Sequence, residues 1–260
     1  MGAYDKVTAA RAKGRPTGID FIANIFDDFI ELHGDRRFGD DKAVVAGIAR
    51  LNTMPVTVVA LERGHDTKEK VFRDFGSAHP EGYRKALRQM KLAEKFGRPV
   101  VCFVDTSGAF CGIAAEERGQ GQAIAENLME MMTLRIPVIS VLIGEGGSGG
   151  ALALAVADEV WMLENAIYSV ISPEGCASIL WKDSSKVKEA SECLKLTAQD
   201  LLEMKVIEKV IGENSKNFHR TYVDLKQNLS ETLIRNSSID AGELVEKRYA
   251  RFRKIGPEYK

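Results

Sequence analysis

The sequence predicts an α/β protein in which short buried strands alternate with helices. The evidence is a pattern that occurs twice in succession. Residues 100–104 and 137–143 are apolar runs rich in β-branched residues, and each precedes a glycine-bearing loop and then a helical segment. Parallel strands joined in this way place their loops at one edge of the sheet, where ligands usually bind. We therefore expect the two loops to meet at one cleft.

The first third of the chain predicts an exposed lead-in, a helix and a hairpin. Residues 1–18 are polar and interrupted by Gly14, Pro16 and Gly18, which is typical of an exposed segment. A helix should follow Asp20 as its N-cap. Its helically spaced apolar residues are Ile22, Ile25, Phe26, Phe29 and Ile30. Residues 44–51 and 56–61 then predict two strands joined by a turn at 52–54.

Two long helices are predicted around the first loop. The helix over 80–96 should bury an apolar side and expose a basic one. Its apolar side contains Tyr83, Leu87, Met90 and Leu92, and its basic side contains Arg84, Lys85, Arg88 and Lys91. The second helix should run from about Glu116 to Leu134, directly after the loop that follows residues 100–104.

The last third predicts short strands and then helices. Strands are expected at 159–163, 167–170 and 206–211. Ser172 before Pro173 predicts a helix start, and Thr197 with Asp200 resembles a capping box. Residues 216–253 are amphipathic and should be mostly helical. No long repeat or linker separates these segments, so residues 19–260 are predicted to form a single domain after the lead-in.

Composition limits the classes of function. The chain has 260 residues, 45% of them hydrophobic and 28% charged, with a net charge of −1, so no basic surface for nucleic acid is expected. No apolar run reaches the ~18 residues that span a bilayer, and the N-terminus resembles no signal peptide, which predicts a cytoplasmic protein. The four cysteines lack CxxC spacing and the histidines lack ligand spacing, so neither disulfides nor a metal site is expected.

The most informative motif is GEGGSGGALALA, which starts at Gly144. Without side chains, glycine backbone N–H groups can approach an anion closely, and a helix N-terminus adds free donors. Gly108 and Ala109 in the first loop could then face Gly149 and Gly150 in the second. Two N–H groups aimed at one oxygen form an oxyanion hole. The alternative is that the small residues only allow the helix to pack closely against the sheet.

Several motifs together resemble the carboxyltransferase α subunit of bacterial acetyl-CoA carboxylase. They are GDDKAVVAGIARL, DTKEK, PEGYRKALR, IAAEERGQ, GEGGSGGALALAV and YSVISPEGCASILWK. The match covers roughly residues 10–255 in the same order. It implies a crotonase-like (ClpP/crotonase) fold, a spiral of ββα units with a helical C-terminal region. It also implies transfer of a carboxyl group from carboxybiotin to acetyl-CoA, giving malonyl-CoA for fatty-acid biosynthesis.

The resemblance also implies roles for individual residues. Gly149 and Gly150 would form the biotin-side oxyanion hole, faced by Gly108 and Ala109. Four further residues are weaker candidates for the cofactor side: Gly146 and Gly147 as loop-shaping glycines, and Glu116 and Arg118 as residues that orient biotin or hold the loop. No side-chain base and no metal on this chain are needed, because carboxybiotin would release CO2 and its ureido anion would take the α proton of acetyl-CoA, whose enolate then attacks CO2. The protein would mainly stabilise the two oxyanions and orient the reactants.

The same resemblance implies partners and leaves the acceptor open. A β subunit with a zinc ribbon would supply the acetyl-CoA side in an α2β2 assembly, joined by a biotin carboxyl carrier protein and an ATP-using biotin carboxylase. Related subunits act on propionyl-CoA or decarboxylate glutaconyl-CoA. This chain departs from the family in a shorter N-terminal helical region and in its loop DTSGAFCG, where Ser107 and Cys111 replace prolines.

Two functions of other classes fit parts of the sequence. Residues 146–150 match GxSxG, so Ser148 could be the nucleophile of a serine hydrolase. The partners available after it are His219 and the acids Asp158, Asp183 and Asp200. A non-catalytic scaffold is the other alternative, in which the basic helix from Arg84 to Lys91 binds a partner or a CoA phosphate.

Overall fold

A computed structural model describes residues 1–214 and 217–256, and its centre is one mixed β-sheet. Along the sheet the strand order is β1-β2-β3-β4-β5-β6-β8, and β7 pairs with the end of β5. The strands are β1 Asp27–Glu31, β2 Val44–Leu51, β3 Met54–Leu61, β4 Val100–Thr106, β5 Val138–Gly147, β6 Glu159–Leu163, β7 Ile167–Ser169 and β8 Lys209–Ile211.

The direction of the strands agrees with the sequence prediction. β1, β2 and β3 are antiparallel, and the predicted hairpin joins β2 to β3. From β3 onward, the pairs along the sheet are parallel. Every residue of β4 and β5 is buried, as expected for parallel strands covered on both faces. The predicted strand over 206–211 is shorter than expected and begins at Lys209.

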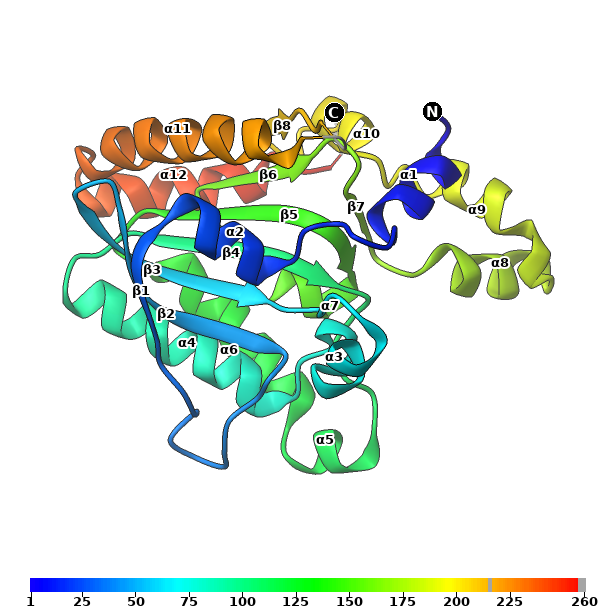
Figure 1. Ribbon diagram of the computed structural model, residues 1–260, viewed down its shortest axis with the longest axis horizontal. Helices are drawn as coiled ribbons and strands as arrows, with labels where there is room; N and C mark the ends of the chain where they lie inside the picture. Colours follow the sequence, from blue (N-terminus) through cyan, green and yellow to red (C-terminus); the bar gives the residue numbers. More distant parts are fainter. Residues whose placement is uncertain (215–216, 257–260) are drawn as a thin grey trace.

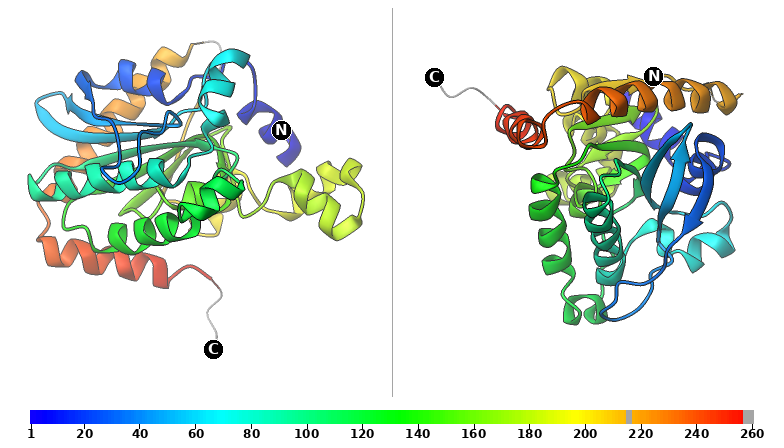
Figure 2. Two further views of the ribbon diagram at one scale, coloured as in Figure 1. Left: turned by 90° about the horizontal axis from the view of Figure 1, so that it is seen from below. Right: turned by 90° about the vertical axis from the view of Figure 1, so that its left-hand side faces the viewer.

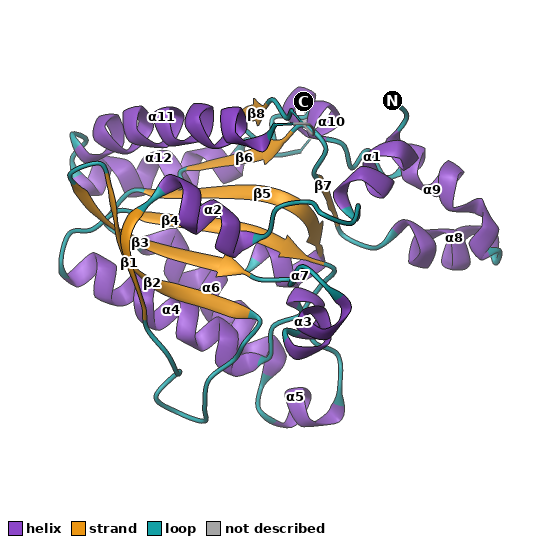
Figure 3. Cartoon of the chain, viewed as in Figure 1, coloured by secondary structure: helices purple, strands orange, loops and turns teal. Residues whose placement is uncertain are grey.

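Helices cover both faces of the sheet. Figures 1 and 2 show α4 and α6 on one face and α2 on the other, with α11 packed beside α2 and α12 beside α6. In Figure 3, α8 and α9 project from the body of the molecule on the same side as α1. The helices are α1 Ala3–Ala10, α2 Gly18–Ile25, α3 Thr67–Phe72, α4 Pro80–Lys95, α5 Ile113–Glu117, α6 Gln120–Thr133, α7 Ser148–Leu152, α8 Pro173–Trp181, α9 Val187–Cys193, α10 Ala198–Glu203, α11 Phe218–Ser237 and α12 Ala241–Arg253.

The C-terminal region is helical, as predicted, and a buried arginine attaches it to the body. The predicted segment 216–253 forms α11 and α12, although Lys216 itself lies outside the described residues. Arg248 on α12 is almost fully buried and donates to Asp158 Oδ1 at 2.8 Å. The same guanidinium donates to the carbonyl oxygens of Leu134 and Ile136, between α6 and β5. These bonds fix α12 against the sheet.

The N-terminal segment is not the exposed lead-in that its polarity predicted. It forms α1, which buries Ala3, Val7 and Ala10. Arg11 then donates to Glu145 Oε1 at 2.5 Å and to Glu174 Oε1 at 2.7 Å. Arg15 donates to the carbonyl oxygen of Ile143 and pairs with Glu213. The prediction was wrong because these arginines are partners of buried carboxylates rather than solvated charges.

The first predicted helix begins and ends earlier than expected. Thr17 is the N-cap of α2, and Asp20 lies inside the helix, where its carboxylate accepts the Thr17 N–H at 2.8 Å. The helix ends at Ile25, and Phe29 and Ile30 belong to β1. Their spacing fits a helix and a strand alike, and pairing with β2 decides in favour of the strand.

The other predicted helices also differ in detail. The segment 116–134 is two helices, because Gly119 adopts a φ of +82° between α5 and α6. On α4, Lys85 is fully buried instead of solvated, and its Nζ donates to Asp40 Oδ1 at 2.6 Å. Arg84 pairs with Asp35 at 2.8 Å. The predicted caps Ser172 and Thr197 are confirmed for α8 and α10.

The Arg11 ion pairs predict a pH-dependent stability. Burial alone would raise the pKa of Glu145, but hydrogen bonds and charges from Arg11 and Arg63 outweigh it and lower that pKa below the usual 4.5. The pairs therefore stabilise the fold above about pH 4.5, and this stabilisation is lost as the pH falls through the lowered pKa. Arg11→Met should lower the free energy of unfolding by about 2 kcal/mol at pH 7 and by less at pH 3 to 4, measured by urea unfolding.

The matched control is Lys13→Met, which removes an exposed cation and should leave stability unchanged at both pH values. An Arg11→Met loss that is equal at low and neutral pH would show that packing, and not the ion pairs, anchors the segment.

Candidate functional site

The two predicted loops leave neighbouring parallel strands at the same edge of the sheet. β4 ends at Thr106 and leads into residues 107–112, and β5 ends at Gly147 and leads directly into α7. Thr106 is in register with Gly146. Because β4 and β5 are parallel, both loops emerge side by side, close to α5 and α7 in Figure 1.

The loops touch backbone to backbone, and glycines make this contact sterically possible. A Cβ atom on Gly150 would overlap the backbone nitrogen of Ala109 and lie 2.7 Å from the carbonyl carbon of Gly108. A Cβ on Gly147 would overlap the carbonyl oxygen of Ser107. The structure thus brings Gly150 against the pair that the sequence predicted, although their role in an oxyanion hole stays a prediction.

Gly149 and Ser148 face outward from this contact. A Cβ on Gly149 would be in ordinary contact with Ile124, at 3.8 Å, so nothing crowds this position. Ser148 is exposed and has a φ of +52°, a conformation that costs energy for a residue with a side chain. The predicted helix is only the five residues of α7. An anion at this turn would therefore be bound mainly by backbone N–H groups, because a helix this short has only a small dipole.

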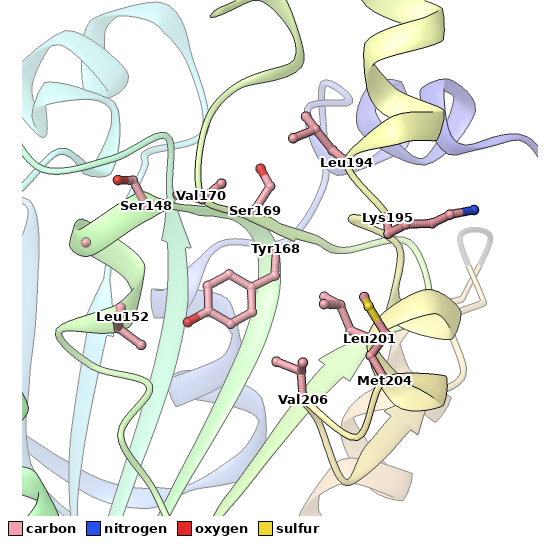
Figure 4. Close-up of a pocket in the computed structure, with 11 residues that line it drawn as sticks. Ser148, Leu152, Tyr168, Ser169, Val170, Leu194, Lys195, Leu201, Met204 and Val206 are labelled. Carbon is pink, nitrogen blue, oxygen red and sulfur yellow. The ribbon is translucent and has the colours of Figure 1, made fainter. Parts of the chain in front are cut away.

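A cavity of about 340 Å³ opens beside Ser148 and Gly149. Figure 4 shows its side chains arranged around the ring of Tyr168. The wall is mainly apolar, with Ser169 and Lys195 as polar members; its apolar residues are Leu152, Tyr168, Val170, Leu194, Leu201, Met204 and Val206. Burial raises the pKa of Tyr168 to about 12, so its hydroxyl is a neutral donor at physiological pH. No sequence pattern indicates this cavity, because its walls come from four separate segments.

Charged groups hold the two strands together below the loops. Arg63, after β3, donates to Glu145 on β5 at 2.6 Å and lies 3.6 Å from Asp105 on β4. Asp105 accepts the backbone N–H of Glu145 at 2.9 Å, and a Cβ on Gly144 would lie 2.5 Å from its carboxylate. Burial raises the pKa of Asp105, and the charge of Arg63 opposes that shift. Arg63 therefore links both loop-bearing strands.

The weaker site candidates have other surroundings than expected. A Cβ on Gly146 would overlap Leu142 and lie 3.0 Å from the Tyr168 ring, so this glycine allows β5 and β7 to pack closely. Arg118 pairs with Glu81 at 3.0 Å and covers the ring of Phe38. Glu116 is exposed on α5. The involvement of these residues in binding biotin stays a prediction.

One residue next to the loop contact was assigned only to the apolar side of a helix. Tyr83 on α4 is fully buried, and its hydroxyl lies 2.9 Å from the position that a Cβ on Gly150 would occupy. Within residues 1–214 and 217–256, this hydroxyl has no hydrogen-bond partner. Helical spacing predicts that Tyr83 is buried, but it contains no information about what its hydroxyl faces.

The features of a serine hydrolase are incomplete. Ser148 has the strained turn of a nucleophile, but among the described residues its hydroxyl forms no hydrogen bond with a histidine or carboxylate. His219 is exposed at the start of α11, where its backbone N–H donates to Asn217 Oδ1 at 3.2 Å. In the part of the chain that the structure describes, no three His, Cys, Asp or Glu side chains gather as metal ligands.

Other structural findings concern membranes and cysteines. None of the helices formed by the described residues combines the length and apolar character needed to cross a bilayer. All four cysteines are free: Cys102 and Cys176 are buried, whereas Cys111 and Cys193 are exposed.

Solved structures with the same architecture identify the class of fold. A transcarboxylase 12S chain with bound methylmalonyl-coenzyme A has a TM-score of 0.69 and 22% identity over 86% of this chain, which spans 44% of that chain. A chain of the Pseudomonas malonate decarboxylase hetero-tetramer, solved with coenzyme A, has a TM-score of 0.65 and 19% identity, covering 84% of this chain and 90% of that one. The fold is the crotonase fold of carboxyltransferases, as the sequence predicted.

Sequence relatives identify the family. The family described as acetyl co-enzyme A carboxylase carboxyltransferase-like matches residues 1–256. The acetyl-coenzyme A carboxylase carboxyl transferase subunit alpha of Ruminiclostridium cellulolyticum is 68% identical over 98% of both chains. The acetyl-coenzyme A carboxylase carboxyl transferase subunits beta/alpha protein of Natranaerobius thermophilus is 57% identical. The match covers 97% of this chain and 42% of that protein. This chain belongs to the acetyl-CoA carboxylase carboxyltransferase α-subunit family.

The loop contact predicts opposite outcomes for two adjacent glycines. Gly150→Ala should lower the free energy of unfolding by about 1 to 3 kcal/mol, because its Cβ overlaps the Ala109 backbone. Gly149→Ala should change it by less than about 1 kcal/mol, since that position is open. Urea unfolding of both variants measures the difference, and equal stabilities would mean that the loops are not in contact.

Proposed function

We propose that this chain, together with a β subunit, transfers a carboxyl group from carboxybiotin to acetyl-CoA and so makes malonyl-CoA for fatty-acid biosynthesis. Membership of the α-subunit family supports the reaction. The structural observation that carries the proposal is the backbone contact between residues 107–109 and 147–150, beside an open cavity. A site that offers backbone donors and no catalytic side-chain base suits a reaction whose main need is stabilisation of oxyanions.

The donors of the proposed oxyanion hole are the N–H groups of Gly149 and Gly150, with Ala109 and Gly108 as the facing pair. Of that pair, the Gly108 N–H already donates to Thr106 Oγ1 at 3.1 Å. In a site that excludes water, fixed N–H donors stabilise negative charge on an oxygen without having to reorganise. Arg63 preserves their spacing, because it binds carboxylates on both strands below the loops. Gly146 and Gly147 act indirectly, by allowing the strands and loops to approach each other.

The cavity beside Gly149 suits the ring system of biotin. Its volume of about 340 Å³ lies in the range of small-ligand pockets, and its wall is mainly apolar with a few polar groups. Biotin carries the carboxyl group and supplies a ureido oxygen on which negative charge develops. Leu152, Leu201 and Val206 would contact the ring, while Ser169 and Tyr168 offer hydroxyl groups. Lys195 would lie close to the carboxyl group that biotin carries for transfer.

The proposed assembly is an α2β2 carboxyltransferase in which residues 19–260 act as one domain. The fused beta/alpha relative supports a β partner, because this chain covers only the α part of its length. A biotin carboxyl carrier protein and an ATP-using biotin carboxylase complete the proposal, and all components would work in the cytoplasm. Acetyl-CoA is favoured over propionyl-CoA or glutaconyl-CoA because the 68% identical relative is named for acetyl-CoA.

The proposed function predicts malonyl-CoA-dependent carboxylation of free biotin. Purified chain mixed with its β subunit should be active, and either subunit alone should be inactive. Gly150→Ala should lower kcat by about 100-fold or more, because its Cβ overlaps the nitrogen of the facing Ala109 N–H. The assay measures the acetyl-CoA that is released as biotin is carboxylated.

The control is Ser148→Ala, which keeps every backbone donor and should retain most of the carboxyl transfer. If Ser148→Ala abolished the activity, Ser148 would be a nucleophile and a covalent mechanism would replace this one. An assembled, folded wild-type complex without transfer activity would refute the proposed function.

A further inference from the structure

The hydroxyl of Tyr83 occupies an unusual position directly behind the proposed site. The side chain is fully buried between α4 and the sheet, and its Oη has no hydrogen-bond partner among the described residues. Most buried hydroxyls in proteins are paired, so an orphan of this kind needs a physical explanation.

The unpaired Tyr83 hydroxyl faces the contact between the loop at 107–112 and the start of α7. Oη lies 2.9 Å from the point where a Cβ on Gly150 would be, and the carbonyl carbon of Gly108 lies 2.7 Å from the same point. The carbonyl oxygen of Gly108 already accepts the Thr106 hydroxyl at 2.8 Å, which leaves it a second lone pair. Oη and the Gly108 carbonyl group therefore border the same point, and a rotation of the 108–109 peptide that turns this oxygen toward Oη would give Tyr83 an acceptor.

The far side of the same loop is held in place. The Phe110 N–H donates to the carbonyl oxygen of Ala78 at 3.0 Å, and the Gln120 side chain bridges the carbonyls of Ala78 and Phe110 at 2.8 and 2.9 Å. The part that contains Gly108, where a φ of +147° suits only glycine, is instead tied to the Thr106 side chain, whose hydroxyl accepts the Gly108 N–H at 3.1 Å and donates to the Gly108 carbonyl oxygen. This is also the part that Tyr83 faces.

The unpaired Tyr83 hydroxyl destabilises the ligand-free chain, and a ligand-bound state in which it is paired would remove this penalty. An unpaired buried hydroxyl destabilises the fold, and phenylalanine would fill almost the same space without that penalty. Burial and the nearby charge of Asp41 raise the pKa of Tyr83, so the hydroxyl keeps its proton and can donate to an acceptor. If the Tyr83 hydroxyl forms a hydrogen bond only when ligand is bound, that bond stabilises the bound state relative to the free state.

We propose that Tyr83 is a positioning residue for carboxyl transfer, whose hydroxyl donates to the Gly108 carbonyl when the loop adjusts to a bound oxyanion and so orients the Ala109 N–H. This inference rests on the proposed function, because it assumes that the loop binds an oxyanion. Since the bond forms with the developing charge, its loss lowers kcat more than it raises KM.

The test is Tyr83→Phe in the assembled α and β complex, assayed by malonyl-CoA-dependent carboxylation of free biotin. We expect kcat to fall about 10- to 100-fold, with KM for biotin changed by less than about twofold. Urea unfolding of the same variant should show unchanged or increased stability, because an unpaired hydroxyl has been removed. A role in structure alone cannot produce lower kcat together with higher stability.

Tyr222→Phe is the matched control. It removes the hydroxyl of another largely buried tyrosine, on α11, where the ring packs against Phe21 and Phe218. Its kcat should equal that of the wild type. Wild-type kcat in Tyr83→Phe, or a parallel loss of kcat and stability, would overturn the inference about Tyr83. Loss of transfer in the wild-type complex would instead overturn the proposed function, which makes the two failures distinguishable.

Discussion

The direct backbone contact between residues 107–109 and 147–150 is the constraint on which the rest of the site depends. It exists because two parallel strands end side by side and because Gly147 and Gly150 have no side chains where the loops meet. Arg63 supports it from below by binding Asp105 and Glu145, the acidic residues near the ends of those strands. Arg11 adds a second link, from α1 to Glu145. The N-terminal helix, the sheet and the loops thus form one connected ionic and steric unit.

Much of the fold could be predicted from local patterns. β4 and β5 are apolar and β-branched, the hairpin from β2 to β3 has a short polar turn, and Ser172 caps α8 in the predicted way. Several of the errors have a common physical origin, because each depends on a partner far away in the sequence. Arg11 and Lys85 look like solvated charges until Glu145 and Asp40 are placed beside them. Phe29 and Ile30 fit a helix until β2 provides a strand to pair with.

The site could be predicted only in part. Strand, glycine loop and helix in succession indicate which loops meet, and the family resemblance adds a reaction. The sequence does not distinguish glycines that face a ligand from glycines that allow packing: Gly149 is open, whereas Gly146 and Gly147 are closed against Leu142 and Ser107. It also does not reveal the Tyr83 hydroxyl or the cavity around Tyr168, because those depend on segments far apart along the chain.

The most direct test is a crystal structure of the assembled α and β complex with biotin bound. The account predicts that the ureido oxygen lies about 3 Å from the backbone nitrogen of Gly149 or Gly150 and faces Ala109, with the ring in the cavity beside Tyr168. Biotin bound elsewhere, with these backbone donors facing only protein, would contradict the assignment of the oxyanion hole to the two glycine loops.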